Sequence, residues 1–427
     1  MSFTCEIKQS SSDNKLQFEI LGNPEYGFEK TIVNAIRRTL LSSIDTYAFR
    51  TDYDNPDIII ETNNTSLHNE FILDRVGLIP LYMDPINSPI NNPLKYLFVL
   101  NFKHDNSNPI SIITAANFNI YELDKNIMNS SDYENGLINT INKDNYNLKK
   151  PLPDDLKKEI FRPFQDKYYS IIIETKSTNS DENIQELILY GSPSVSIAKE
   201  DARWQAVSCA TYSYKIDESL LKQIIQDKIL MDNIIDIDQF KKEFEISNGQ
   251  RYFHRDNHGE PYWYNFVIEG QHFLNNKELF IKANEIIIQS LNDFKGELDK
   301  LLLDEDTPIH ITFNKNDAKN NVINMLIELQ YVIEDKKIFY GFDDTLGSII
   351  QAHISRYMID DKSVLNCCGY KRTHPLENKI LFTMSMNNTD SSIDEQTKKK
   401  SVIEVFDNCC DELINIFNTI ISSADTI

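Results

Sequence analysis

Glycine and cysteine are both scarce in this chain of 427 residues. Only 12 residues are glycine, and no glycine-rich loop of the kind that cradles phosphate groups is present. The six cysteines are Cys5, Cys209 and two adjacent pairs, and none shows the C-x₂-C spacing of zinc sites. We therefore expect neither a metal nor a cofactor, and such sparse cysteine usage is typical of a reducing compartment.

Long apolar runs are also absent. Nowhere do eighteen apolar residues follow one another, and the first ten residues, MSFTCEIKQS, contain no basic region followed by an apolar stretch. We expect neither a membrane span nor a signal peptide, and hence an intracellular protein.

Positive charge is in short supply. There are 43 Lys and Arg residues against 65 Asp and Glu, so the formal net charge is −22. A surface this acidic repels phosphate backbones, which predicts little or no direct contact with nucleic acid and favours proteins as partners. The hydrophobic share of 41% is enough for real cores, and the length exceeds the ~250–300 residues at which a single core stops growing. Two or more domains are expected.

Two similar amphipathic segments lie more than three hundred residues apart, TIVNAIRRTLLSS at 31–43 and DTLGSIIQAHISR at 344–356. In the first segment the apolar residues that share one helical face are Ile32, Val33, Ile36, Leu40 and Leu41. Arg37 and Arg38 point largely away from that face. On pattern alone, the two arginines are the solvated back of an amphipathic helix.

Each short segment is followed later in the chain by a long helical pattern. The first begins at Asn276, with the apolar positions Phe280, Ala283, Ile287, Leu291, Phe294, Leu298 and Leu301. The second carries Val402, Phe406, Cys409, Leu413, Ile416 and Ile420. Both keep the three-four spacing of a helix packed along another helix, so the two stripes can bury each other. We expect Cys409 to pack as a small apolar residue.

The remaining patterns predict strands and an inserted region. DIIIET is β-rich and is followed by LHNEFILDRVGLIPLYMD, while YYSIIIET and LILYG alternate as strands between polar loops. After KEDARWQAV a strand pattern, an acidic helical piece and the strand YWYNFVIEG follow. In 379–386, Ile380, Phe382, Met384 and Met386 alternate with the other side chains, so one face of that strand is covered.

These patterns together predict an α+β fold of two similar halves that pair within one chain. The expected domains are a discontinuous first half at 1–50 and 192–303, a β-rich insertion at 51–191, and a second half at 304–427.

The segments NAIRRTLLSSIDTYAF and HNEFILDRVGLIPL resemble the alpha-like assembly subunits of multisubunit RNA polymerases, of the archaeal D and eukaryotic third-largest type. KEDARWQAVSCATY resembles the return from the insertion in that type. DDTLGSIIQAHISRYMIDDKSVLNCCGYKRTHPLENKILF is similar to the partner type, the archaeal L and eukaryotic eleventh-largest subunits. Both types normally form a heterodimer of separate chains, and their fusion resembles the form found in some large DNA viruses. That origin would place the protein in the virion and the host cytoplasm.

The resemblance implies a non-catalytic assembly platform of a DNA-directed RNA polymerase, which docks the largest and second-largest subunits beside small polymerase subunits. The implied docking residues are Asn34, Arg37, Arg38, Asp74, Arg75 and Gly77 for the second-largest subunit, and Gly347, Ser348, Gly369, Tyr370, His374 and Pro375 in the second half. The implied interface between the halves comprises Ile36, Leu40, Ile287, Leu291, Phe294, Leu298, Ile350, Phe406, Leu413 and Ile416. Many D-type subunits hold a metal cluster in the insertion, but residues 85–191 contain no cysteine, so none is carried over.

Two competing functions remain open on the sequence. One is a metal-dependent nucleotide-handling enzyme that uses Asp236 and Asp238, although hard cations need more converging oxygen ligands than one such pair supplies. The other is a free-standing scaffold that keeps the fold outside a polymerase.

Two histidine-bearing segments have a bland and a sharp interpretation. His254, Asp256 and His258 stand close enough for a metal site, but lack a visible further ligand and fit a turn. His374 before Pro375 lacks the partner that a catalytic base requires, which favours a structural turn.

Overall fold

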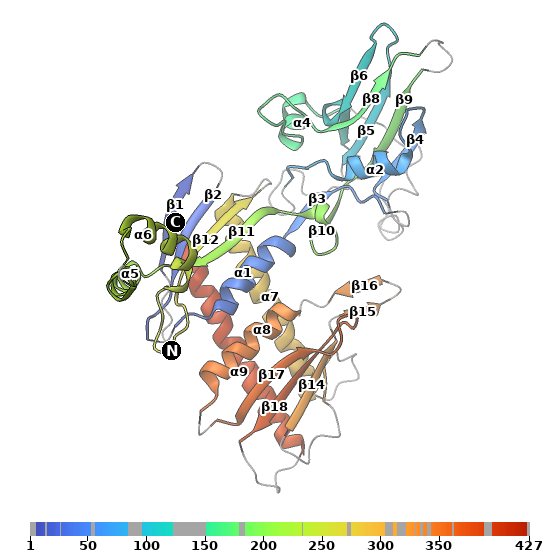
Figure 1. Ribbon diagram of the computed structural model, residues 1–427. Helices are drawn as coiled ribbons and strands as arrows, with labels where there is room; N and C mark the ends of the chain where they lie inside the picture. Colours follow the sequence, from blue (N-terminus) through green and yellow to red (C-terminus); the bar gives the residue numbers. More distant parts are fainter. Residues whose placement is uncertain are drawn as a thin grey trace. The chain divides into compact units, whose positions relative to one another are not determined.

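The computed structural model describes residues 6–12, 15–25, 27–52, 56–83, 96–122, 151–178, 184–232, 234–270, 275–303, 311–313, 322–328, 330–333, 336–339, 343–360, 363–387 and 395–424. Two compact units form (Figure 1). The first unit comprises Met1–Leu40, Cys209–Glu269 and Asn276–Ile427, and the second comprises Leu41–Ser208 and Gly270–Asn275. The predicted insertion, 51–191, lies within the second unit, and the predicted break at 304–310 lies outside the described residues.

The first unit contains two four-stranded sheets, one from each predicted half. One sheet has the order β1 (Glu6–Ser12), β2 (Lys15–Leu21), β12 (Trp263–Gly270), β11 (Val207–Tyr214). The other has the order β13 (Ile311–Phe313), β14 (Val322–Glu328), β18 (Lys379–Met386), β17 (Leu365–Arg372). A separate pair joins β15 (Gln330–Ile333) to β16 (Lys336–Phe339).

Helices of both halves lie between these two sheets in Figure 1. They are α1 (Lys30–Ser42), α7 (Asn276–Leu303), α8 (Asp344–His353) and α9 (Glu395–Ala424), and α8 continues as one π-helical segment, η10 (Ile354–Met358). Helix α7 contacts β2 and β13, while α8 contacts β17 and α9 contacts β1. Helix α7 of the first half thus also contacts a strand of the second half, and α9 of the second half contacts a strand of the first.

Aromatic rings join each sheet to its long helix. The Phe280 ring on α7 lies edge-on to Phe18 of β2 at 4.8 Å. In the other half, Phe406 on α9 meets Phe382 of β18 at 5.2 Å, also edge-on. Since such pairs combine a large buried area with a preferred geometry, they fix how each helix lies on its sheet.

The alternation predicted for the last strand is confirmed. In β18 the side chains of Ile380, Phe382, Met384 and Met386 are buried, and those between them are not. The helix predicted from Asn276 also begins at that residue.

A helical hairpin separates β11 from β12, as the acidic helical pattern predicts. It consists of α5 (Glu218–Asp232) and α6 (Ile237–Asn248), followed by one 3₁₀ turn, η8 (Gly249–Arg251). Leu221 and Ile225 of α5 and Phe244 of α6 form its own small core.

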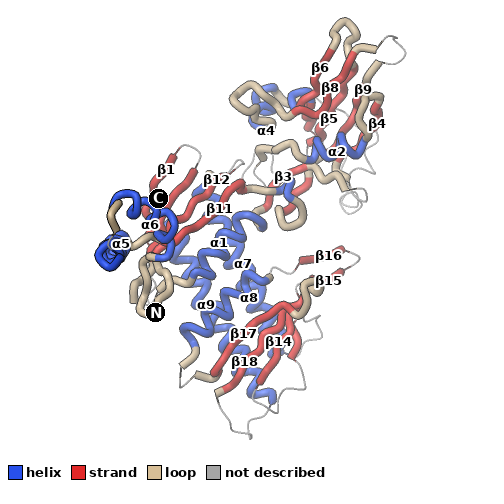
Figure 2. Tube along the Cα trace, viewed as in Figure 1, coloured by secondary structure: helices blue, strands red, loops and turns tan. Residues whose placement is uncertain are grey.

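The second unit is dominated by strands, drawn red in Figure 2. Its main sheet has the order β4 (Ile58–Asn63), β9 (Glu186–Gly191), β5 (Tyr96–Lys103), β7 (Phe118–Glu122). Two pairs are added, β6 (Ile110–Thr114) with β8 (Ile171–Lys176), and β3 (Asp45–Ala48) with β10 (Ser194–Ile197). Besides a helix at Asn69–Gly77, the described part of this unit contains the short helical segments η2 (Ala115–Asn117), α4 (Asp154–Ile160) and η7 (Ala202–Trp204).

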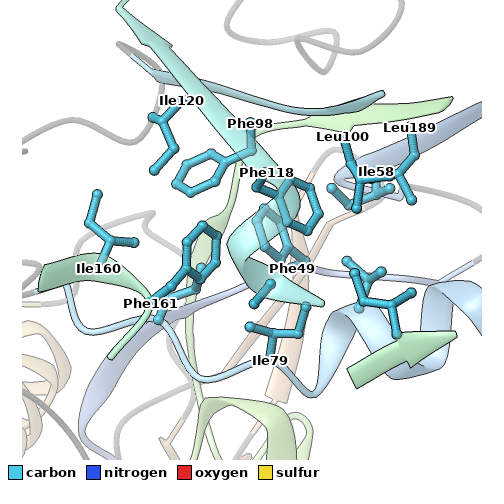
Figure 3. Packing of buried hydrophobic residues seen from close by; sticks show 14 of the residues in the cluster. Phe49, Ile58, Ile79, Phe98, Leu100, Phe118, Ile120, Ile160, Phe161 and Leu189 are labelled. Carbon is cyan, nitrogen blue, oxygen red and sulfur yellow. The ribbon is translucent and has the colours of Figure 1, made fainter. Parts of the chain in front are cut away.

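Aromatic side chains fill the centre of the second unit. Phe49, Phe98, Phe118 and Phe161 point toward one another in Figure 3, with Phe49 and Phe98 edge-on at 5.3 Å. The core explains why the insertion holds together with no cysteine in 85–191.

Two details differ from the sequence patterns. The segment LHNEFILDRVGLIPLYMD, in which no helix is predicted, contains α2 (Asn69–Gly77). On α9 the fully buried residue after Leu413 is Phe417, whereas Ile416 is only half-buried. The stripe steps by four residues at that turn because 3.6 residues per turn shift a three-four pattern around the helix.

Candidate subunit interface and docking sites

The long helices of the two halves lie along each other, and α7 packs against α9. Phe294 of α7 meets Phe406 of α9 edge-on at 6.4 Å. Beside them, the Lys295 Nζ lies 3.2 Å from Asp407 Oδ1 and 2.5 Å from Asp411 Oδ1. Burial opposes the charge on Lys295, but hydrogen bonds with the two carboxylates raise its pKa overall. A cation of the first half is thus held by two anions of the second.

Most residues of the expected interface are buried in the first unit. The fully buried ones are Ile36, Leu40, Ile287, Leu291, Phe294, Leu298, Ile350, Phe406 and Leu413. Cys409 is buried as well, and its Sγ donates to the Ile350 carbonyl across 3.9 Å. Burial raises the pKa of the Cys409 thiol, so it stays protonated and packs as an apolar side chain.

A partly buried arginine forms a second ionic contact between the halves. Arg356, in η10, donates from Nη1 to Glu29 Oε1 at 2.9 Å and from Nη2 to Asp256 Oδ2. The Asp256 side chain has no exposed surface, and its Oδ1 accepts from the backbone N–H groups of His258 and Glu260. Charges this well enclosed require each other, since any one left alone would be buried without a counter-ion.

Gly27 lies directly beside the Arg356–Asp256 ion pair. Its φ is +76°, a backbone conformation that residues with a Cβ rarely adopt. A Cβ at Gly27 would also collide with the Asp256 carboxylate and the Arg356 guanidinium. Glycine is therefore needed at this position for two independent reasons.

His353, the last residue of α8, is buried. His353 Nε2 lies 2.8 Å from Glu412 Oε2 of α9, and its ring lies 5.0 Å from that of Tyr357. Burial lowers the pKa of His353, although Glu412 opposes the shift. The imidazole is neutral near pH 7 and acts as a hydrogen-bonding part of the core.

The predicted docking residues of α1 differ in their surroundings. Arg37 is half-buried and donates from Nε to Asn34 Oδ1 at 3.0 Å. Arg38 is exposed, yet its Nε donates to Thr345 Oγ1 of α8 at 3.0 Å. Arg38 thus also contacts the second half.

In the second half, the predicted docking set divides into buried and exposed members. Gly347 is buried, and a Cβ there would stand 3.1 Å from the Tyr370 ring. Ser348, Gly369 and Tyr370 are half-buried. His374 and Pro375 are exposed in a turn, where His374 Nδ1 accepts from the Leu376 N–H at 3.1 Å. This is the structural turn that the sequence favours for His374.

Helix α2 of the second unit presents one exposed face. Phe71, Asp74, Arg75 and Leu78 are all exposed and follow the i, i+3, i+4, i+7 spacing of one helical face. Arg75 Nη2 donates to the Ile171 carbonyl of β8 at 3.1 Å. Gly77 is buried instead, and a Cβ there would lie 2.9 Å from Arg203 Nη1 and 3.1 Å from the Phe49 carbonyl oxygen. The apolar residues Phe71 and Leu78 are not part of the predicted set.

The residues of the candidate metal sites make structural contacts. Asp236 caps α6 by accepting from the Gln239 N–H, and Asp238 is exposed in the first turn. His254 stacks on Trp263 at 4.9 Å, while Asp256 is committed to Arg356 and its turn. Within the described ranges, no three His, Cys, Asp or Glu side chains converge where they could hold a metal ion. Among the same residues, no helix is both long and apolar enough to cross a membrane.

Comparison with protein families identifies the architecture. Two family models, both described as the RNA polymerase Rpb3/Rpb11 dimerisation domain, match residues 25–291 and residues 338–423. The chain therefore belongs to the Rpb3/Rpb11 dimerisation-domain family of RNA polymerase assembly subunits and carries two such domains. No curated protein matches its sequence.

The sequence patterns did not predict the ion pairs between the two halves. Arg356, Glu29 and Asp256 are separated by one hundred residues or more from their partners. A helical pattern shows which side chains face inward but not which distant charge meets them. The available signal is Arg356 itself, a charged residue between Ile354 and Ile359 in a stretch with no other Lys, Arg, Asp or Glu.

Proposed function

We propose that this chain is the assembly platform of a DNA-directed RNA polymerase, in which the two halves of one polypeptide replace the usual heterodimer. The observation that carries the proposal is the pairing of α7 with α9, because Phe294 and Lys295 of one dimerisation domain meet Phe406 and Asp407 of the other. Covalent fusion holds the second domain at an effective concentration of roughly mM order, so pairing does not depend on protein concentration. The proposal assigns no catalytic step to this chain.

In this proposal each of the two large subunits binds its own set of residues. Asn34, Arg37 and Arg38 on α1, with Asp74 and Arg75 on α2, contact the second-largest subunit. Exposed Phe71 and Leu78 support the α2 assignment, because an apolar pair around an acid and a base is typical of a protein interface. Ser348 and residues 369–375, which are the end of β17 and the turn after it, contact the largest subunit, with small polymerase subunits bound beside them.

The docking assignment is tested by reversing charges on α2. Asp74→Lys with Arg75→Glu keeps the net charge and replaces two exposed side chains. We expect the second-largest subunit to be lost from purified complexes while the chain stays folded. A parallel variant, Arg37→Glu with Arg38→Glu, tests α1, and its melting temperature must be measured because Arg38 also contacts Thr345.

The chain offers a matched control on another exposed helix face. Glu218 and Lys222 of α5 form an exposed pair at 3.6 Å, and Glu218→Lys with Lys222→Glu reverses it in the same way. This control should leave the complex unchanged. If the α2 variant also retains the second-largest subunit at wild-type strength, the docking assignment is wrong.

A further inference from the structure

The apex of the α5–α6 hairpin carries large apolar side chains in solvent. We define the apex as residues 227–232 at the end of α5 and residues 234–238 at the start of α6. Leu230, Met231 and Ile235 have relative exposures of 77%, 80% and 98%, and Ile237 is also exposed.

These side chains are not needed to hold the hairpin together. The core of the hairpin is built from Leu221, Ile225 and Phe244, with Ile224, Ile229, Phe240 and Tyr252 packed around it. On α5 the stripe runs through Leu221, Ile225 and Ile229 at four-residue steps, so Leu230 and Met231 lie outside it. Apolar side chains that gather outside a core are typical of a surface that binds another molecule.

The charge around the apex is negative. Asp227, Asp232, Asp236 and Asp238 all lie within the apex and are exposed. Lys228 is the basic residue of the same range, and its Nζ lies 5.1 Å from the centre of the Phe244 ring. The apex thus combines exposed apolar side chains with four exposed aspartates.

A partner surface complementary to the apex would combine apolar and basic side chains. In a polypeptide, a helix with Leu or Ile along one stripe and Lys or Arg on both sides provides that combination. Opposite charges at the rim raise the association rate and select the partner, while the apolar contacts slow dissociation.

We propose that the apex of the α5–α6 hairpin is a docking surface for a basic amphipathic helix of a protein partner. None of its residues belongs to the docking surfaces assigned above to the large polymerase subunits, so the two assignments stand or fall separately. A membrane of anionic lipid shares the apolar and charged character of a ligand, but its charge has the wrong sign for four aspartates.

The test uses full-length protein and a synthetic fluorescent helix with leucines at three-four spacing and lysines at the other positions. Fluorescence anisotropy measures its dissociation constant. We expect Leu230→Ser with Ile235→Ser to weaken binding at least tenfold, and Asp232→Asn with Asp236→Asn to weaken it several-fold at low salt. Asn at position 236 retains a capping oxygen, so α6 should still form.

The same hairpin provides a matched control. Ile246 is exposed like Leu230, but it lies near the other end of α6 from the apex. Ile246→Ser should bind the peptide as the wild type does, and the single variant Met231→Gln gives a second reading of the apex. All substituted side chains are exposed, so melting temperatures should be unchanged and co-purification with large polymerase subunits should be retained.

Several outcomes would overturn the proposal. One is equal binding by the wild type and the Leu230/Ile235 variant, which would make the peptide a general ligand of an acidic protein. Another is equal affinity for a peptide with glutamate in place of lysine. A third is apex-dependent binding to phosphatidylserine vesicles, which would assign the surface to lipid.

Discussion

At the residue scale, buried charges decide how the two halves are tied. Arg356 joins the second half to Glu29 and Asp256 of the first, in surroundings that exclude most water. Sequence reasoning identified the turn around Asp256 but not its arginine, since the partners are 100 residues apart. The apolar stripes were readable because their spacing is local, whereas an ion pair between distant segments has no periodicity.

Removal of Arg356 should destabilise the chain markedly. Arg356→Met leaves the Asp256 carboxylate buried without its cation, so we expect a loss of about 3 kcal/mol in the free energy of unfolding. Chemical denaturation measures the change. Arg372→Met is the control, because the half-exposed Arg372–Asp344 pair should contribute less than about 1 kcal/mol. Equal effects of the two substitutions would show that the Arg356 network does not hold the halves.

A carboxyl of the second unit predicts a pH dependence. Burial raises the pKa of Asp57 to about 6, although Ser194 and the Arg50 N–H donate to its Oδ2. The folded state therefore keeps this proton where the unfolded chain loses it. The stability that Asp57 contributes is fully present below the usual pKa of an aspartate and is lost as the pH rises to about 6.

The variant Asp57→Asn isolates that contribution. Its free energy of unfolding should lack the fall that Asp57 causes between about pH 4 and pH 6, while other titrating groups act alike in both proteins. Denaturation curves of wild type and variant across this range measure the difference. A constant difference from pH 4 to pH 7 would contradict the raised pKa.

At the element scale, local periodicity predicted both helices and strands. The long helices and the alternating β18 were predicted from local spacing, because one buried face imposes one period. Helix α2 was missed since its buried residues, Ile72 and Val76, give a single four-residue step in only nine residues. Phe71 within the helix and Leu78 directly after it are apolar but exposed, which obscures the pattern further.

Neighbouring residues of α9 provide a test of where its apolar stripe runs. Phe417 is fully buried and Ile416 is half-buried. Phe417→Ala should cost about 3–5 kcal/mol of the free energy of unfolding, whereas Ile416→Ala should cost less than about 2 kcal/mol. Thermal and chemical denaturation of the two variants compares them directly. A larger loss of stability for Ile416→Ala than for Phe417→Ala would contradict this assignment and favour the stripe through Leu413 and Ile416 that the sequence pattern predicts.

At the scale of the whole molecule, one polypeptide contains two dimerisation domains that pair with each other. The family matches cover both halves, and α7 packs on α9 within a single compact unit. Fusion removes the need to find a partner subunit, and it fixes the ratio of the two domains at one to one. The docking sites proposed for the large subunits rest on the family resemblance, because contacts within one chain do not show where another protein binds.

The number of chains in an assembled complex tests the central claim most directly. Native mass spectrometry of this chain reconstituted with the largest and second-largest polymerase subunits measures that number. Intramolecular pairing predicts one copy of this chain per complex at every protein concentration. Two copies per complex, or a copy number that rises with concentration, would contradict it, because the two domains would then pair between chains.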